Sequence, residues 1–174
     1  MEHETTLYES KWLGLYRRGT WDYVRRPNST GCVGILALTD AGEVVLIEQF
    51  RVPVGKTVIE IPAGLVGDEP EFFGETLANT ARRELLEETG YAAEEMEEIL
   101  VSPTAAGMTP ELCHLFLARG LSKVAAGGGV AGENIHCHIV PLEELRSFLA
   151  ERQARGDAVD FKIYAGLAAA NVAF

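Results

Sequence analysis

Residues 75–90 constrain the fold more than any other part of this sequence. The segment is rich in good helix formers and ends at Gly90, the residue type that most often follows the last residue of a helix. Glu84, Glu87 and Glu88 stand at i, i+3 and i+4, so a helix places their carboxylates within about 100° of one face. The chain must therefore accommodate a helix with a concentrated negative face.

Strand-like segments surround this helix. They are short apolar or alternating runs closed by turn residues, and we predict strands over residues 20–26, 32–38, 43–50, 58–61, 97–101, 114–118 and 135–140. Residues 64–74 contain three glycines and a proline and are predicted to be a loop. Two more helices are expected, one starting at Pro141 and one over about 159–170. This order predicts the α/β class, as an α/β/α sandwich around a mixed β-sheet.

The charge of the chain limits its partners. Its 26 acidic and 15 basic residues give a net charge of −11, so nucleic acid is not expected to bind, since a phosphate backbone requires a basic face. No apolar run approaches the ~18 residues that span a membrane, and the N-terminus has no apolar signal core, so we expect a cytoplasmic protein. The three cysteines, an odd number, are interpreted as small buried side chains.

The residues alone leave two interpretations of the acidic face. A solvated glutamate-rich face is common, and like charges at this spacing cost only about 0.2–0.5 kcal/mol per pair. A metal site is favoured because Arg83 is the only basic residue in the run 83–90, and because a predicted strand ending at Pro62-Ala63-Gly64 leads into the helix. Such a turn brings backbone carbonyls beside the carboxylates, and hard oxygen ligands suit Mg²⁺ or Mn²⁺.

The same residues resemble the signature of the Nudix hydrolase family. Glu75 is followed, after seven residues, by Arg83-Glu84-Leu85-Leu86-Glu87-Glu88-Thr89-Gly90-Tyr91. The chain departs from the family pattern in one respect, because ten residues rather than five separate Gly64 from Glu75. Loops absorb such insertions at small cost, so we expect the helix to be intact.

Further elements are similar to the branch of the family that hydrolyses ADP-ribose and related nucleoside diphosphate sugars. These are Gln49-Phe50-Arg51 and Pro62-Ala63-Gly64. The resemblance implies a Mg²⁺ site, with Mn²⁺ as an alternative, held by Glu84, Glu87, Glu88 and the carbonyl of Ala63. It also implies that Arg51 and Glu60 bind substrate and that Arg83 orients the acidic residues. The implied products are a nucleoside monophosphate and a sugar phosphate.

Residues 1–28 are similar to the N-terminal β extension of this branch, and residues 29–174 to its catalytic domain. The resemblance implies a homodimer in which Trp12 and Trp21 stack on the base and Arg26 adds a polar contact, often in the partner's site. The alternative is that both tryptophans are core or interface anchors. Ala106 stands where ADP-ribose hydrolases commonly carry a proline, so a broader range of nucleotide sugars remains open.

The resemblance also implies a general base on a loop after the helix. Glu133 occupies a comparable place, with Glu87 assisting, and four glycines between residues 127 and 132 suit a loop that closes over substrate. An ordinary flexible loop is the alternative. His136 and His138 could face one side of a strand, but we interpret them as solvated or packing residues. Two other functions stay open, namely cleavage of dinucleoside polyphosphates or NADH, and non-catalytic sensing of a nucleotide sugar.

Overall fold

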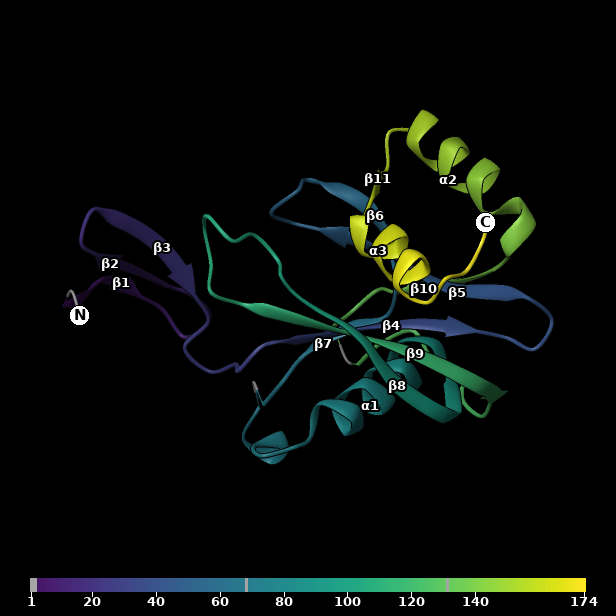
Figure 1. Ribbon diagram of the computed structural model, residues 1–174, viewed down its shortest axis with the longest axis horizontal. Helices are drawn as coiled ribbons and strands as arrows, with labels where there is room; N and C mark the ends of the chain where they lie inside the picture. Colours follow the sequence, from purple (N-terminus) through teal and green to yellow (C-terminus); the bar gives the residue numbers. More distant parts are fainter. Residues whose placement is uncertain (1–2, 68, 131) are drawn as a thin grey trace.

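The computed structural model describes residues 3–67, 69–130 and 132–174, and its strands form two separate sheets. The first sheet is antiparallel and consists of β1 (Glu4–Glu9), β2 (Gly14–Arg18) and β3 (Trp21–Arg25). It stands beside the rest of the molecule, to which the segment after β3 connects it (Figure 1). Only the last of these strands is predicted from the sequence, because β1 is mostly exposed and neither β1 nor β2 carries a run of buried apolar residues.

The second sheet is mixed and forms the centre of the molecule. Its strands are β4 (Cys32–Leu38), β5 (Glu43–Arg51), β6 (Lys56–Glu60), β7 (Ala63–Leu65), β8 (Tyr91–Pro103), β9 (Leu112–Lys123), β10 (His136–Pro141) and β11 (Ala158–Val159). The main order is β11-β6-β5-β4-β9-β8, with β10 paired to β5 and β7 paired to β4. The β4–β9 and β6–β11 pairs are parallel, and the remaining pairs are antiparallel.

Strand β4 changes partners along its length, and this change shapes the site. Its last residues, Ala37 and Leu38, pair with β5, whereas its first residues, Cys32 to Gly34, pair with β7. The amide of Ile35 also donates to the carbonyl of Pro62 at 2.8 Å. The turn that carries Ala63 and Gly64 is therefore fixed within the sheet. The sequence predicts a loop from residue 64, and this is wrong at its start because β4 offers a free edge to residues 63–65.

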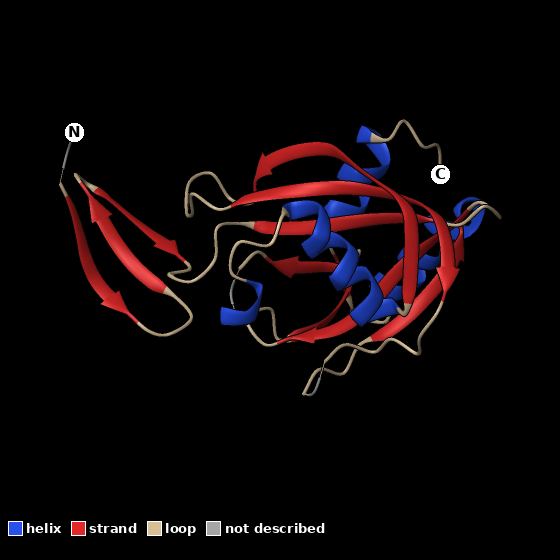
Figure 2. Cartoon of the chain, turned by 90° about the horizontal axis from the view of Figure 1, so that it is seen from below, coloured by secondary structure: helices blue, strands red, loops and turns tan. Residues whose placement is uncertain are grey.

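Helices cover both faces of this sheet, which confirms the predicted α/β/α sandwich. Helix α1 (Leu77–Thr89) lies on one side, and α2 (Leu145–Ala154) and α3 (Phe161–Ala169) lie on the other (Figures 1 and 2). Short 3₁₀ turns precede α1 and α2, at Pro70–Phe72 and Leu142–Glu144. Each face has its own apolar core, with Ala81 and Leu85 of α1 in one and Leu149 of α2 and Leu167 of α3 in the other.

The ends of α1 are set by their capping residues. The hydroxyl of Thr76 accepts a hydrogen bond from the amide of Asn79 at 3.3 Å, which begins the helix two residues later than Glu75. Gly90 has a φ of 71° and donates its amide to the carbonyl of Leu86 at 2.8 Å, which ends the helix. The glutamates therefore lie in the last two turns, close to a well-defined end.

Strand β8 is longer than the sequence predicts. It begins at Tyr91, directly after the helix, whereas the prediction starts at Glu97. Glutamates at 94, 95, 97 and 98 conceal the strand signal, and the fold tolerates them because β8 is an edge strand with one side open to water. In the described part of the chain, no helix is long and apolar enough to span a membrane.

Candidate active site

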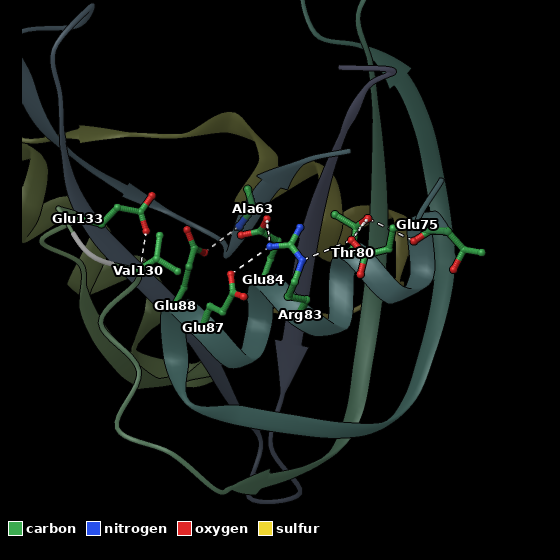
Figure 3. A network of polar contacts seen from close by, with 10 residues as sticks. Ala63, Glu75, Thr80, Arg83, Glu84, Glu87, Glu88, Val130 and Glu133 are labelled. Carbon is green, nitrogen blue, oxygen red and sulfur yellow. Dashed lines mark hydrogen bonds and ion pairs between the residues drawn. The ribbon is translucent and has the colours of Figure 1, made fainter. Parts of the chain in front are cut away.

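The acidic face of α1 points toward the turn after β6 (Figure 3). The carboxylate of Glu88 accepts a hydrogen bond from the amide of Ala63 at 3.0 Å, and its side chain is almost fully buried. A Cβ atom on Gly64 would stand only 2.0 Å from the carboxyl carbon of Glu84. Gly64 is thus the residue type that lets this strand approach the glutamates, a close contact that a sequence pattern alone does not reveal.

Arg83 contacts three carboxylates, two on the helix and one just before it. Its guanidinium lies 2.9 Å from Glu84, 3.0 Å from Glu87 and 3.3 Å from Glu75. The central carbon of the guanidinium lies over the ring of Phe72, 4.0 Å from its centre, in a cation–π contact. Arg83 thus contacts Glu75, Glu84 and Glu87 at the same time.

Glu88 carries an electrostatic cost in this setting. Burial raises the pKa of its carboxyl to about 8, because a charge away from water is unfavourable, and the nearby charges of Glu84 and Glu133 raise the pKa further. The Ala63 amide and Arg51 act in the opposite direction. A carboxylate buried beside other carboxylates is an environment that a bound cation would stabilise.

The donor set fits a hard divalent cation. Three carboxylates and the backbone at Ala63 supply oxygen atoms of the kind that Mg²⁺ and Mn²⁺ prefer. Within residues 3–67, 69–130 and 132–174, no three acidic, histidine or cysteine side chains stand in ready-made metal geometry. The hydrogen bonds explain this, because Arg83 holds Glu84 and Glu87 while Ala63 holds Glu88. Ligation would require these side chains to turn away from those partners.

A second pair of charged residues lies next to this face. Arg51, at the end of β5, forms two parallel hydrogen bonds with Glu60 of β6, at 2.6 and 3.1 Å. Glu60 is almost fully buried, whereas Arg51 is partly exposed. The structure thus places Glu60 beneath Arg51, where it fixes the guanidinium. Gln49, two residues earlier on the same strand, has a buried Oε1 with no hydrogen-bond donor in the described part of the chain.

Glu133 approaches the acidic face from the loop between β9 and β10. Its carboxylate accepts a hydrogen bond from the amide of Val130 at 3.1 Å and is close enough to Glu88 to raise that residue's pKa (Figure 3). The structure therefore brings Glu133 together with Glu84, Glu87 and Glu88. The glycines before it contact the end of α1.

Trp12, Trp21 and Arg26 line surface hollows, and Trp12 and Arg26 share one of them with Leu65, next to the Ala63-Gly64 turn. Both tryptophans are largely exposed, which excludes a place in the core of the single chain. Trp12 lines a hollow of about 920 Å³ together with residues 27–30, Phe73 and Glu75. Trp21 lines a hollow of about 320 Å³ with residues 106–110, which include Ala106. Arg26 forms an ion pair with Glu111 at 3.0 Å.

The histidines and cysteines considered in the sequence lie outside the acidic face. His138 bonds Glu48 at 2.8 Å, and Arg152 of α2 bonds the same carboxylate at 2.8 Å, on the side of the sheet away from α1. His136 is exposed, and within the described residues no third ligand stands with the two histidines. All three cysteines are free, with Cys113 buried and the other two partly buried.

The fold and the site define an α/β/α protein with an arginine-ordered acidic helix facing a strand turn. A family model described as NUDIX domain matches residues 29–164, and the chain belongs to the Nudix family. It is 36% identical over 135 residues to a methanol dehydrogenase activator of Bacillus methanolicus, covering 76% of this chain and 68% of that one. It is 45% identical over 94 residues to an ADP-ribose pyrophosphatase of Bacillus subtilis, covering 53% of this chain and 47% of that one.

Two further comparisons concern substrate and fold. A GDP-mannose pyrophosphatase of Cronobacter sakazakii is 37% identical over 124 residues, covering 66% of this chain and 61% of that one. The chain thus spans about half to two thirds of the length of these relatives. A solved structure of an ADP compounds hydrolase superposes with a TM-score of 0.74 at 18% identity, covering 97% of this chain and 90% of that one, which shows the shared fold.

Proposed function

We propose that this chain hydrolyses the diphosphate of nucleoside diphosphate sugars in a Mg²⁺-dependent reaction, with ADP-ribose as the favoured substrate. The observation that carries the proposal is the packing of Glu84 and Glu88 against the Ala63-Gly64 turn, where the missing Cβ of Gly64 makes room for a carboxylate. The names of the Bacillus subtilis and Cronobacter sakazakii relatives support the substrate class.

Four groups would hold the cation in this proposal. They are the carboxylates of Glu84, Glu87 and Glu88 and the carbonyl of Ala63. When bound, Mg²⁺ or Mn²⁺ would polarise the diphosphate and lower the pKa of the attacking water. Arg83 keeps the carboxylates on one side of the helix by its contacts with Glu84 and Glu87.

Arg51 would contact the diphosphate, and Glu60 would act through it. The two parallel hydrogen bonds hold the guanidinium in one orientation, while its exposed side remains available to an anion. Glu60 itself is too buried to reach substrate in this arrangement, so we assign it a positioning role in place of direct contact.

Glu133 would accept a proton from the attacking water, with Glu87 assisting. Glu133 lies beside the acidic face and keeps its carboxylate oriented through the amide of Val130. A correctly placed general base contributes about 10²–10⁴-fold to a rate. Both residues thus combine proximity to the expected reaction centre with a defined orientation.

Trp12, Trp21 and Arg26 would bind the base across the interface of a homodimer. Within one chain Trp12 lines a hollow with Glu75 and Trp21 lines one with residues 106–110, and residues 1–28 expose large apolar side chains such as Tyr8, Trp12 and Trp21. A second copy would cover these side chains and bring the tryptophans to its own site. Residues 1–28 would then serve dimerisation and base stacking, and residues 29–174 would be the catalytic domain.

A substrate panel tests the proposed function. The purified chain is incubated with ADP-ribose, GDP-mannose, a dinucleoside polyphosphate and NADH, in Mg²⁺, in Mn²⁺ and with EDTA, and products are separated by chromatography. We expect AMP and ribose 5-phosphate from ADP-ribose, and no turnover with EDTA. Glu88→Gln should lower kcat at least about 10²-fold. Glu95→Gln, the same change on an exposed strand residue, serves as the matched control.

Three outcomes would contradict the proposal. Faster cleavage of NADH or of the dinucleoside polyphosphate would assign another Nudix substrate. Full activity in a folded Glu88→Gln protein would show that Glu88 does not bind the cation. Binding of ADP-ribose without turnover would favour a sensing role, which the name of the Bacillus methanolicus relative, an activator, makes worth measuring.

A further inference from the structure

The loop between β9 and β10 satisfies the C-terminal end of α1. The last four carbonyls of any helix lack partners within the helix. Here Leu86 accepts from the amide of Gly90 at 2.8 Å, whereas the carbonyls of Glu87 and Glu88 accept from the amides of Gly129 and Gly128, at 3.0 and 2.9 Å. The loop thus binds the backbone of two of the residues proposed to hold the cation.

Lys123 completes this set of bonds. Its ammonium group donates to the carbonyl of Thr89 at 2.5 Å and to the carbonyl of Ala126 at 3.2 Å, so it joins the helix end to the loop. A positive charge at a helix C-terminus is also favourable with respect to the helix dipole. The carbonyl of Gly90 accepts from the amides of Val124 and Ala125, at 2.9 and 3.1 Å. The last four carbonyls of the helix, those of Leu86, Glu87, Glu88 and Thr89, therefore all have hydrogen-bond donors.

The contact is so close that it requires glycine. Gly127 has a φ of 76°, and a Cβ atom there would lie 2.5 Å from the carbonyl carbon of Thr89. Gly90 has a φ of 71°, and its Cβ would lie 2.1 Å from the carbonyl oxygen of Ala125. The two backbones pack directly on each other, which explains these glycines without a hinge or a closing movement.

Glu133 is attached to the docked loop, defined here as residues 124–129. Its amide donates to the carbonyl of Val130 at 3.0 Å, and its carboxylate accepts from the amide of Val130 at 3.1 Å. A Cβ on Gly129 would lie 2.5 Å from the same carboxylate, so this side chain lies over Gly129. On the far side, the buried Ile135 donates to the carbonyl of Gly128 at 3.4 Å.

We propose that the docked loop is a positioning element that holds Glu133 beside the acidic face of α1 before any ligand binds, and that Gly127 is its key residue. The inference rests on the proposed function, in which Glu133 accepts the proton. In this proposal the glycines of the docked loop form a fixed support for Glu133. The sequence, with its many glycines, suggests a loop that closes over substrate. Gly127 acts through the backbone of α1 and touches no substrate.

Hydrogen exchange tests the docking without any activity measurement. In the metal-free and substrate-free chain, we expect the amides of Gly128 and Gly129 to exchange at least about 100-fold more slowly than in an unstructured peptide of the same sequence. A lid would leave these amides unprotected until substrate binds. Exchange at the peptide rate, with protection gained only on adding Mg²⁺ and ADP-ribose, would overturn the proposal.

Kinetics test the positioning role. Gly127→Ala should lower kcat about 10–100-fold with little change in KM, since small misplacements of a reacting group cost this much. Gly42→Ala is the matched control, because Gly42 has a φ of 77° but no atom within 4 Å of its Cβ position. In a Glu133→Gln background, Gly127→Ala should have almost no further effect. Equal losses in both backgrounds would show a merely structural role.

A second variant covers the case in which Gly127→Ala does not fold. Gly129→Ala displaces the Glu133 carboxylate itself, a flexible group, and should lower kcat in the same Glu133-dependent way. A folded Gly129→Ala protein with wild-type kcat would overturn the proposal. If no substrate in the panel is cleaved, the proposed function fails, while the exchange experiment still decides whether the loop is docked.

Discussion

Glu88 shows how one residue links stability to the site. It is almost fully buried, lies beside Glu84 and Glu133, and has a pKa raised to about 8 by burial and by these charges. In the unfolded chain the same carboxyl titrates near 4.5. Folding without a cation therefore retains a proton on Glu88 over a pH range in which the unfolded chain has lost it.

The pH dependence of stability follows from this difference. The contribution of Glu88 is fully present below pH 4.5 and is lost as the pH rises toward 8, by at most about 1.4 kcal/mol per pH unit. We expect the Tm of the EDTA-treated protein to fall between pH 5 and pH 8, and Glu88→Gln to reduce this slope. Calorimetric scans across this range measure it. Parallel slopes for the two proteins would refute the assignment.

Glu60 gives a second prediction at the scale of single residues. Glu60→Gln removes one charged partner of Arg51, which should cost about 1–3 kcal/mol of stability and release the guanidinium. We expect KM for ADP-ribose to rise about tenfold and kcat to change less, since Arg51 is proposed to bind the diphosphate.

Glu48→Gln is the matched control for Glu60→Gln. Glu48, on the neighbouring strand β5, also lies beside an arginine, Arg152, but on the other side of the sheet. It should destabilise the protein by a similar amount without changing KM. If both variants raise KM equally, the effect of Glu60 is one of general stability and not of Arg51 orientation.

At the scale of elements, the site depends on the contact between α1 and β7. Helix α1 supplies the carboxylates in a register that the sequence predicts. Strand β7 supplies the backbone of Ala63 and the space at Gly64, because β4 binds it into the sheet. Neither element holds the candidate site by itself.

Gly64→Ala tests this contact. The added methyl group would overlap the carboxyl group of Glu84, which can rotate away, so we expect little loss of stability. Mg²⁺ affinity and kcat should both fall about 10–100-fold, as is usual when the support of a metal ligand is changed. Gly166→Ala in α3 is the control, because its Cβ would make only ordinary contacts with Leu36. Unchanged Mg²⁺ affinity in Gly64→Ala would show that Glu84 does not bind the cation.

At the scale of the whole molecule, the N-terminal sheet is the part that lies outside both apolar cores. Both apolar cores consist of residues from Cys32 onward, so β1–β3 add nothing to them. The sheet projects from one end of the sandwich, with β3 against residues 106–110, and presents exposed aromatic side chains (Figure 2). A single chain thus leaves this surface open to water, which is unfavourable for large apolar groups.

Light scattering should therefore give about twice the 18.9 kDa mass of the chain at micromolar concentration. Trp21→Ala should lower kcat/KM about 5–100-fold, since stacking on a base contributes about 1–3 kcal/mol. A monomer of undiminished activity would refute the shared site.

Mixing experiments decide which chain provides the tryptophan. A mixture of Trp21→Ala and Glu88→Gln chains forms some dimers with one intact composite site if the base is bound across the interface. Activity should then exceed the sum of the two variants measured separately. No recovery on mixing, despite subunit exchange, would place Trp21 in the site of its own chain.

The sequence by itself determined the acidic helix, most strands of the mixed sheet and the candidate metal residues. These follow from local rules, because helix periodicity places Glu84, Glu87 and Glu88 on one face and apolar runs mark buried strands. Even so, the sequence concealed β1, β2 and the first half of β8, whose exposed polar residues do not show the pattern of a buried strand.

Only the tertiary structure decided which distant segments meet the acidic face. The contact of Gly64 with Glu84, the burial of Glu60 under Arg51 and the docking of Gly127 on Thr89 all join residues from different elements. Such contacts depend on strand pairing and on the absence of a single Cβ atom. Neither leaves a periodic signal in the chain, so the same glycines suggest a flexible loop in sequence and form a rigid support in the fold.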